Sequence, residues 1–135
     1  MTAASADLQK AMFAALTGNA ALVALMGGAR IFDRAPTDAA FPYVTFGRTS
    51  VFDWSTSTEE GLEHLVTLHV WSKARGRKEA FAILDAVRTA LGVPLSLDGQ
   101  HLVSFRFEFA EVTFDDDISV HHGLLRLRAV TESAV

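Results

Sequence analysis

The sequence predicts an α+β fold: a mostly antiparallel sheet of four or five strands, with short N-terminal helices and a long helix packed on one face. The order of the patterns supports this prediction, because two helical stretches come first, followed by strands, one strongly periodic helix and two more strands. A doubly wound parallel sheet would alternate strands and helices along the whole chain. The 135 residues match the length of one domain, which we expect to span residues 1–135.

The composition narrows the class of protein further. Half of the residues are hydrophobic, 21% are charged and the formal net charge is −4. This much apolar surface can form a core, which argues against intrinsic disorder, and the acidic balance argues against a general polyanion binder. The chain has no cysteine, so disulfides, thiolate metal sites and cysteine nucleophiles are excluded.

The N-terminus has no pattern typical of export. Residues 1–8 are small and polar and include Asp7, whereas a signal peptide has a basic start and an unbroken apolar stretch. The longest apolar stretch, residues 20–26, is far shorter than the ~20 residues that cross a bilayer. We therefore expect a cytoplasmic product without a membrane span.

Two short helices are expected first. Residues 7–16 repeat larger apolar side chains at helical spacing, with Ser5 as a cap, and residues 20–26 follow Asn19 as a cap and end at Gly27. The apolar residues that define these helices are Leu8, Met12, Phe13, Leu16, Leu22, Val23 and Met26.

The next part of the chain has strand character. Residues 30–34 form a brief extended segment, and a strand of β-branched and aromatic residues spans 43–52. Residues 55–61 are polar and predict a solvated loop or the tip of a long hairpin. Residues 63–72 then alternate apolar side chains on both sides, so we expect both faces of this strand to be covered.

The long helix is the clearest element. From Lys78 to Leu91, apolar residues follow one helical stripe, and we expect Gly92 to supply a left-handed C-cap before Pro94. The stripe comprises Ala80, Ile83, Leu84, Val87, Ala90 and Leu91.

The last two strands form an expected antiparallel hairpin. Residues 102–109 alternate so that one face carries Val103, Phe105, Phe107 and Phe109, and residues 118–131 alternate again. The acidic residues 115–117 lie between them at the turn. They could bind a hard cation, but they lack the spacing of a calcium loop, which favours a solvated turn.

No constellation predicts catalysis, a cofactor or a metal. Neither a Gly-x-Ser-x-Gly nucleophile elbow nor a phosphate-binding glycine loop occurs, so a hydrolase lacks an assembled nucleophile and base. The adjacent His121 and His122 point to opposite faces of a strand, and so do His64 and His69. We therefore expect ordinary strand histidines rather than a metal site.

Basic residues crowd the start of the long helix. Arg75, Arg77 and Lys78 lie where the helix dipole already disfavours cations. Two interpretations stay open: a surface that contacts an anionic partner or nucleic acid, and a solvated turn.

Three aromatic residues are the other candidates for an interface. Phe52 and Trp54 border the polar residues 55–61, a pattern that leaves large apolar side chains exposed unless a neighbour covers them. Trp71 lies on the strand face away from Val66 and Leu68, where it fits either a subunit interface or core packing under a second layer.

The order and spacing of several segments resemble the tail completion, or tail terminator, proteins of long-tailed phages and gene transfer agents, which are related in fold to the lambda-type tail terminator. The resemblance spans the chain from the first helix to the last strand. It is carried by residues 31–33, Pro36, residues 41–47, residues 64–72, residues 76–80, Ala90, Leu91 and residues 122–130.

This resemblance implies a structural virion protein without catalysis or cofactors, made in the host cytoplasm. It implies a homo-hexameric ring that ends polymerisation of the tail tube, contacts the tail tube protein and presents a surface to the head-tail connector, or stopper, protein. DNA would pass through the ring without sequence-specific binding. The alternative is a non-catalytic α+β module that binds nucleic acid or a small ligand through the basic turn and the aromatic residues Trp54 and Trp71.

Overall fold

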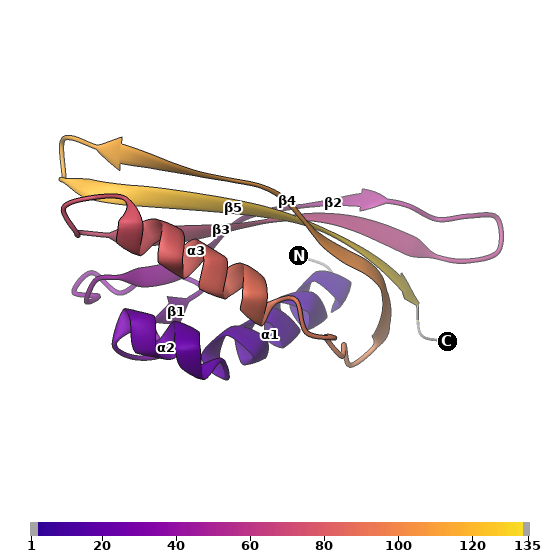
Figure 1. Ribbon diagram of the computed structural model, residues 1–135. Coiled ribbons are helices and arrows are strands. Elements are labelled where there is room, and N and C mark those ends of the chain that lie inside the picture. The colour runs from indigo at the N-terminus through magenta and orange to yellow at the C-terminus, as the bar shows by residue number, and fades with distance from the viewer. Residues whose placement is uncertain (1–2, 134–135) are drawn as a thin grey trace.

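A computed structural model describes residues 3–133 as a five-stranded sheet with three helices on one side (Figure 1). This arrangement confirms the predicted α+β class. The elements are α1 (Ala3–Thr17), α2 (Ala20–Met26), β1 (Ile31–Phe32), β2 (Tyr43–Asp53), β3 (Gly61–Ser72), α3 (Lys78–Ala90), β4 (Gln100–Asp115) and β5 (Val120–Ser133).

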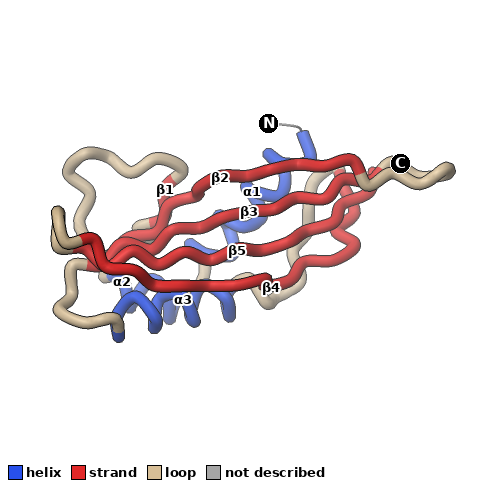
Figure 2. The backbone as a smooth tube through the Cα atoms, turned by 90° about the horizontal axis from the view of Figure 1, so that it is seen from above, coloured by secondary structure: helices blue, strands red, loops and turns tan. Residues whose placement is uncertain are grey.

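The strands lie in the order β1-β2-β3-β5-β4, as Figure 2 shows from above. The two-residue strand β1 pairs with β2 in parallel, and every other neighbouring pair is antiparallel. The expected hairpin of the last two strands is confirmed as β4–β5, although β4 is longer than the predicted residues 102–109. The outermost strands are therefore β4 on one side and the very short β1 on the other.

The ends of the helices agree only partly with the expected caps. Asn19 caps α2 by accepting a hydrogen bond from the backbone N–H of Leu22 at 2.9 Å, as predicted. The expected Ser5 cap is wrong, because Ala3 and Ala4 extend the helix and Ser5 is buried within α1. The expected left-handed cap at Gly92 is also wrong, since α3 ends on a right-handed Leu91 and Gly92 closes a tight turn to the carbonyl of Thr89.

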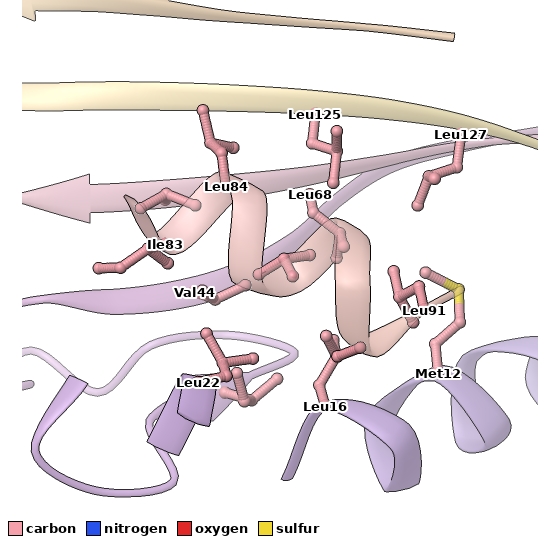
Figure 3. Packing of buried hydrophobic residues seen from close by; sticks show 14 of the residues in the cluster. Met12, Leu16, Leu22, Val44, Leu68, Ile83, Leu84, Leu91, Leu125 and Leu127 are labelled. Atoms are coloured by element: carbon pink, nitrogen blue, oxygen red, sulfur yellow. The ribbon is translucent and has the colours of Figure 1, made fainter. Parts of the chain in front are cut away.

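The core fills the space between the helices and one face of the sheet (Figure 3). The stripe predicted for α3 is buried, and it packs against α1, α2 and the facing residues of β3 and β5. Phe13 departs from the pattern expected of α1, with 44% of its surface exposed. Side chains at the centre of this layer include Met12, Leu16, Leu22, Val44, Leu68, Ile83, Leu84 and Leu125.

No helix of residues 3–133 covers the opposite face of the sheet, which we call the open face (Figure 1). The expectation that both faces of residues 63–72 are covered holds for burial, because none of these residues is exposed, although no helix among residues 3–133 lies over the open face. Val66, Leu68 and Val70 point to the helices and are buried, whereas His69 and Trp71 lie on the open face and are half-buried. Their partial burial comes from neighbouring side chains on the same face, because no other element in the described part of the chain lies over them.

Two β-bulges correct the predicted pattern of β4. One interrupts the pairing with β5 between Leu102 and Ser104, and the other between Phe107 and Phe109. Phe105 and Phe107 pack against the core, but Phe109 pairs with Arg126 and so lies on the open face. The four residues Val103, Phe105, Phe107 and Phe109 therefore share no single face, because each bulge adds one residue and reverses the alternation.

Within residues 3–133, no single helix is long and apolar enough to cross a membrane. The pair α1 and α2 meets the requirement by length and composition together, but it is bent by 75° at the break, and its apolar residues Leu8, Met12, Leu16, Leu22 and Met26 are buried in the core.

Candidate functional site

The hairpin of β2 and β3 extends past the end of the helical layer (Figure 1). Its tip is closed by hydrogen bonds from the N–H of Trp54 to the carbonyl of Gly61 and from the N–H of Thr56 to the carbonyl of Glu59, each 2.9 Å long. Phe52 and Trp54 flank this tip with 50% and 54% of their surfaces exposed. The predicted exposure of both aromatic residues is thus present in the protomer.

Trp54 contacts a charged pair on the open face. The guanidinium carbon of Arg128 lies 5.1 Å from the centre of the Trp54 ring, and Arg128 also forms an ion pair with Glu63. Beside them, hydrogen bonds from Ser55 lower the pKa of Asp53. These contacts hold the base of the hairpin in place while leaving most of the Trp54 ring accessible.

A row of aromatic rings crosses the other end of the open face. Trp71 and His122 stack with a centre-to-centre distance of 4.2 Å and an angle of 3°, and Tyr43 lies 6.4 Å from Trp71. The indole N–H of Trp71 donates to the hydroxyl of Thr45 at 3.1 Å. Trp71 is therefore fixed by neighbours on β2 and β5 rather than buried beneath a helix.

His69 and His122 form a contact that the sequence patterns did not predict. The Nδ1 of His69 lies 2.6 Å from the Nε2 of His122. Burial lowers the pKa of both imidazoles, and the neighbouring His122 lowers that of His69 further, although Glu111 and Asp115 act against the shift at His122. The pair therefore favours the neutral state of both rings.

The remaining histidines are dispersed. His64 is buried on the helix side, where Nε2 lies 2.9 Å from the Thr131 hydroxyl, and burial lowers its pKa. His121 contacts the carbonyl of Ala74 through Nδ1 at 3.2 Å. Within the described residues, no group of three or more His, Asp or Glu side chains could hold a metal ion.

Three arginines gather at the middle of the open face. Arg106 and Arg128 are directly paired across β4 and β5, and Arg126 lies on the same face next to Phe109, with its guanidinium carbon 5.4 Å from the ring centre. Like charges directly opposite each other in a sheet destabilise it. Glu63 balances Arg128, and no other ion pair among residues 3–133 reaches this cluster.

The basic loop, which we define as Arg75, Arg77 and Lys78, lies at the end of the sheet opposite the hairpin tip. All three side chains are exposed, and Arg77 occupies the N-cap position of α3 without a capping hydrogen bond from its side chain. The first turn of α3 contains one acidic residue, Glu79, which accepts a hydrogen bond of 2.6 Å from Ser72. The three cations therefore face solvent.

The structure divides the predicted interface residues into two groups. Phe52 and Trp54 lie at the hairpin end of β3, whereas Trp71 and the basic loop lie at its other end. The arginine cluster and the histidine pair were missed, because within each strand the sequence shows only which residues share a face. Their meeting depends on the register between strands, which no local pattern encodes.

Comparison with known proteins agrees with this fold. A sequence model of the family described as "Tail completion protein gp17" matches residues 10–132. The chain is 29% identical over 126 residues to the "Tail completion protein gp17" of Bacillus phage SPP1, covering 93% of this chain and 92% of that protein.

Two solved structures are similar as well. A chain in the virion of a native gene transfer agent particle matches with a TM-score of 0.89 and 30% identity, covering 98% of this chain and all of the other. The structure of bacteriophage SPP1 gp17 matches with a TM-score of 0.64 and 27% identity, covering 95% of this chain and 91% of the other. The chain belongs to the tail completion protein gp17 family and is a non-enzymatic structural protein of the tail of a phage or gene-transfer-agent virion.

Proposed function

We propose that this protein assembles as a homo-hexameric ring that caps the tail tube, ends its polymerisation and forms the joint with the head. The observation that carries the proposal is the difference between the two ends of the sheet. One end projects the exposed aromatic residues Phe52 and Trp54, and the other presents the basic loop. A protein that joins two different structures needs two chemically different surfaces.

The residues at each end receive separate roles in this proposal. Phe52 and Trp54 contact a neighbouring subunit or the tail tube protein, because burying their exposed rings in an interface is favourable. Arg75, Arg77 and Lys78 contact an acidic surface of a partner, such as the head-tail connector protein. Trp71 stiffens the open face beside them, and DNA passes through the ring without sequence-specific binding.

Negative-stain imaging of the purified protein, alone and with the tail tube protein of the same particle, tests the proposal. We expect closed rings in solution or at tube ends, and tubes that stop growing once the protein is added. Light scattering and DNA binding at several salt concentrations are measured alongside. A monomer that leaves tube growth unchanged and binds DNA with a steep salt dependence would overturn the proposal in favour of a nucleic-acid module.

A further inference from the structure

Both edges of the sheet include a strand edge that has no neighbouring strand among residues 3–133. On one side, β4 is the outermost strand along all of its 16 residues. On the other side, β1 pairs only with Val44 and Thr45, so the outer edge of β2 from residue 46 to 53 has no strand beside it in the described part of the chain. Exposed edges of this kind are templates for pairing with another chain.

The register of the sheet shows that these two edges match each other. Across β3 and β5, Phe46 of β2 is aligned with Ala110 of β4, and Phe52 is aligned with Ser104. Between these two aligned positions, both ends included, β2 and β4 have seven residues each. Over the same stretch, β3 and β5 have only six residues each. The difference arises because one bulge adds a residue to β2 between Phe46 and Thr49, and another adds a residue to β4 between Phe107 and Phe109. The two bulges are aligned with each other across the sheet, one near each edge.

We propose that the free edge of β4 pairs with the free edge of β2 of a second copy of this chain, which continues the sheet from one protomer to the next. The inference rests on the proposed ring and identifies its subunit contact. The antiparallel pairs β2–β3, β3–β5 and β5–β4 make β4 run opposite to β2, so copies related by rotation without an axial shift meet as an antiparallel pair. Such a contact uses two different edges and can close into a ring.

Two of the side-chain pairs that would meet, one charged and one apolar, are complementary. At the level of the bulges, Arg48 of one copy lies opposite Glu108 of the next, and both residues are exposed and outside any ion pair among residues 3–133. On the open face Phe52 meets Ser104, and on the helix side Val51 meets Phe105. Opposite charges and apolar pairs across neighbouring strands each stabilise a sheet.

The strand β1 sets the limit of this contact. Beyond Ala110, β4 of the second copy comes level with Val44 and Thr45, whose outer edge is already occupied by β1. The pairing therefore spans seven residues on each strand.

Cysteine crosslinking tests the pairing directly, because the chain contains no cysteine. Within one protomer the two edges are three strand spacings apart, about 14 Å, so a disulfide between them forms only between copies. We expect oxidation of assembled Phe52→Cys/Ser104→Cys protein to give a ladder of covalent oligomers that ends at the closed ring. Each single variant should give none, and Phe52→Cys/Glu111→Cys serves as the off-register control.

The outcomes separate this contact from the ring itself. Rings that crosslink no more than the off-register control overturn the edge pairing and leave the ring intact. A dimer from Ser104→Cys alone overturns it in favour of a symmetric contact between two β4 strands. Absence of any assembly, alone or with tubes, overturns both proposals.

A charge exchange provides a second test that does not depend on disulfide geometry. Arg48→Glu and Glu108→Arg should each weaken assembly, and the double variant should restore it, with circular dichroism showing an unchanged fold. Full assembly of both single variants at low salt would contradict the predicted register.

Discussion

The imidazoles of His69 and His122 meet edge to edge across β3 and β5, with Nδ1 of one 2.6 Å from Nε2 of the other. At this distance one nitrogen donates a hydrogen bond to the other, so a proton on the accepting nitrogen would break the contact, and protonation of both rings would place two positive charges together. Trp71 stacks on His122, which keeps the pair in a partly dry environment.

Acid should therefore destabilise the protein. The pKa values of His69, His122 and the buried His64 are all lowered from the ordinary 6.5 in the folded state. The unfolded chain then binds more protons, so stability is complete above pH 6.5 and falls as the pH drops from there towards the lowered values. Urea unfolding between pH 7.5 and pH 5 measures this, and a flat or rising profile on acidification would contradict it.

Removing the histidine pair should flatten that profile. We expect His69→Gln/His122→Gln to lose part of the dependence on pH, while the remaining part comes from His64. His101→Gln, at an exposed position on β4, controls for the loss of a histidine as such. If the double variant retains the full slope, the pair is not the source of the acid sensitivity.

Gly47 should be intolerant of a side chain because it lies against His69. A Cβ at this position would lie 2.3 Å from Nε2 of His69. We expect Gly47→Ala to destabilise the fold by about 1–3 kcal/mol, as overpacking does. In the His69→Ala background the penalty should largely disappear, which a double-mutant cycle of unfolding free energies measures. An equal penalty in both backgrounds would mean that the backbone conformation, rather than His69, requires the glycine.

Leu84 should be essential to the core. It is buried, and it lies so close to Gly123 of β5 that a Cβ there would be 3.2 Å from its Cδ1. We expect Leu84→Ala or Val87→Ala to cost roughly 2–4 kcal/mol in unfolding free energy, since each leaves a cavity. Phe81→Ala on the same helix is the matched control, because Phe81 is 49% exposed and should change stability by much less. A change below about 0.5 kcal/mol at both core positions would contradict this packing.

Trp54→Ser should separate folding from assembly. The protomer loses one contact with Arg128, worth about 0.5–1 kcal/mol at an exposed site, so thermal unfolding should change little. Sizing should show a shift from ring to protomer, or docking on the tube should be lost if the ring forms only there. Outright unfolding would assign Trp54 to the core, and normal rings with normal termination would place the interface elsewhere.

The basic loop should act in contacts with a partner and not in folding. Arg75→Glu/Lys78→Glu changes two exposed residues outside the buried stripe of α3, so circular dichroism should be unchanged. We expect weaker attachment to an acidic partner surface, seen as loss of ring stacking or of tail assembly. Normal assembly at both low and physiological salt would show that the loop is only a solvated surface.

Local sequence patterns predicted a helix or strand correctly where one hydrophobic periodicity applies along its whole length. The stripe from Ala80 to Ala90 identified α3, and Asn19 correctly marked the start of α2. In β4 the same reasoning failed, because an inserted residue such as Glu108 reverses the alternation without interrupting the strand composition. The face of Phe109 is decided by its pairing with Arg126, which is information from the partner strand.

In the candidate site, too, local sequence patterns predicted some features and could not predict others. The exposure of Phe52 and Trp54 follows from large apolar residues beside a polar loop, which is visible locally. The contacts between His69 and His122 and between Arg106 and Arg128 join residues far apart in the chain. Only the strand order and register bring them together.

The central strand β3 also has a mechanical consequence. It runs without a break for 12 residues, about 40 Å, from Gly61 at the hairpin to Ser72, whose hydroxyl holds Glu79 at the start of α3. In the proposed joint, tension between the structures attached at its two ends would be carried along the covalent bonds of this one extended backbone, with the hydrogen-bonded strands β2 and β5 resisting shear. The spacing between those structures in the proposed joint would be set by the length of this one strand.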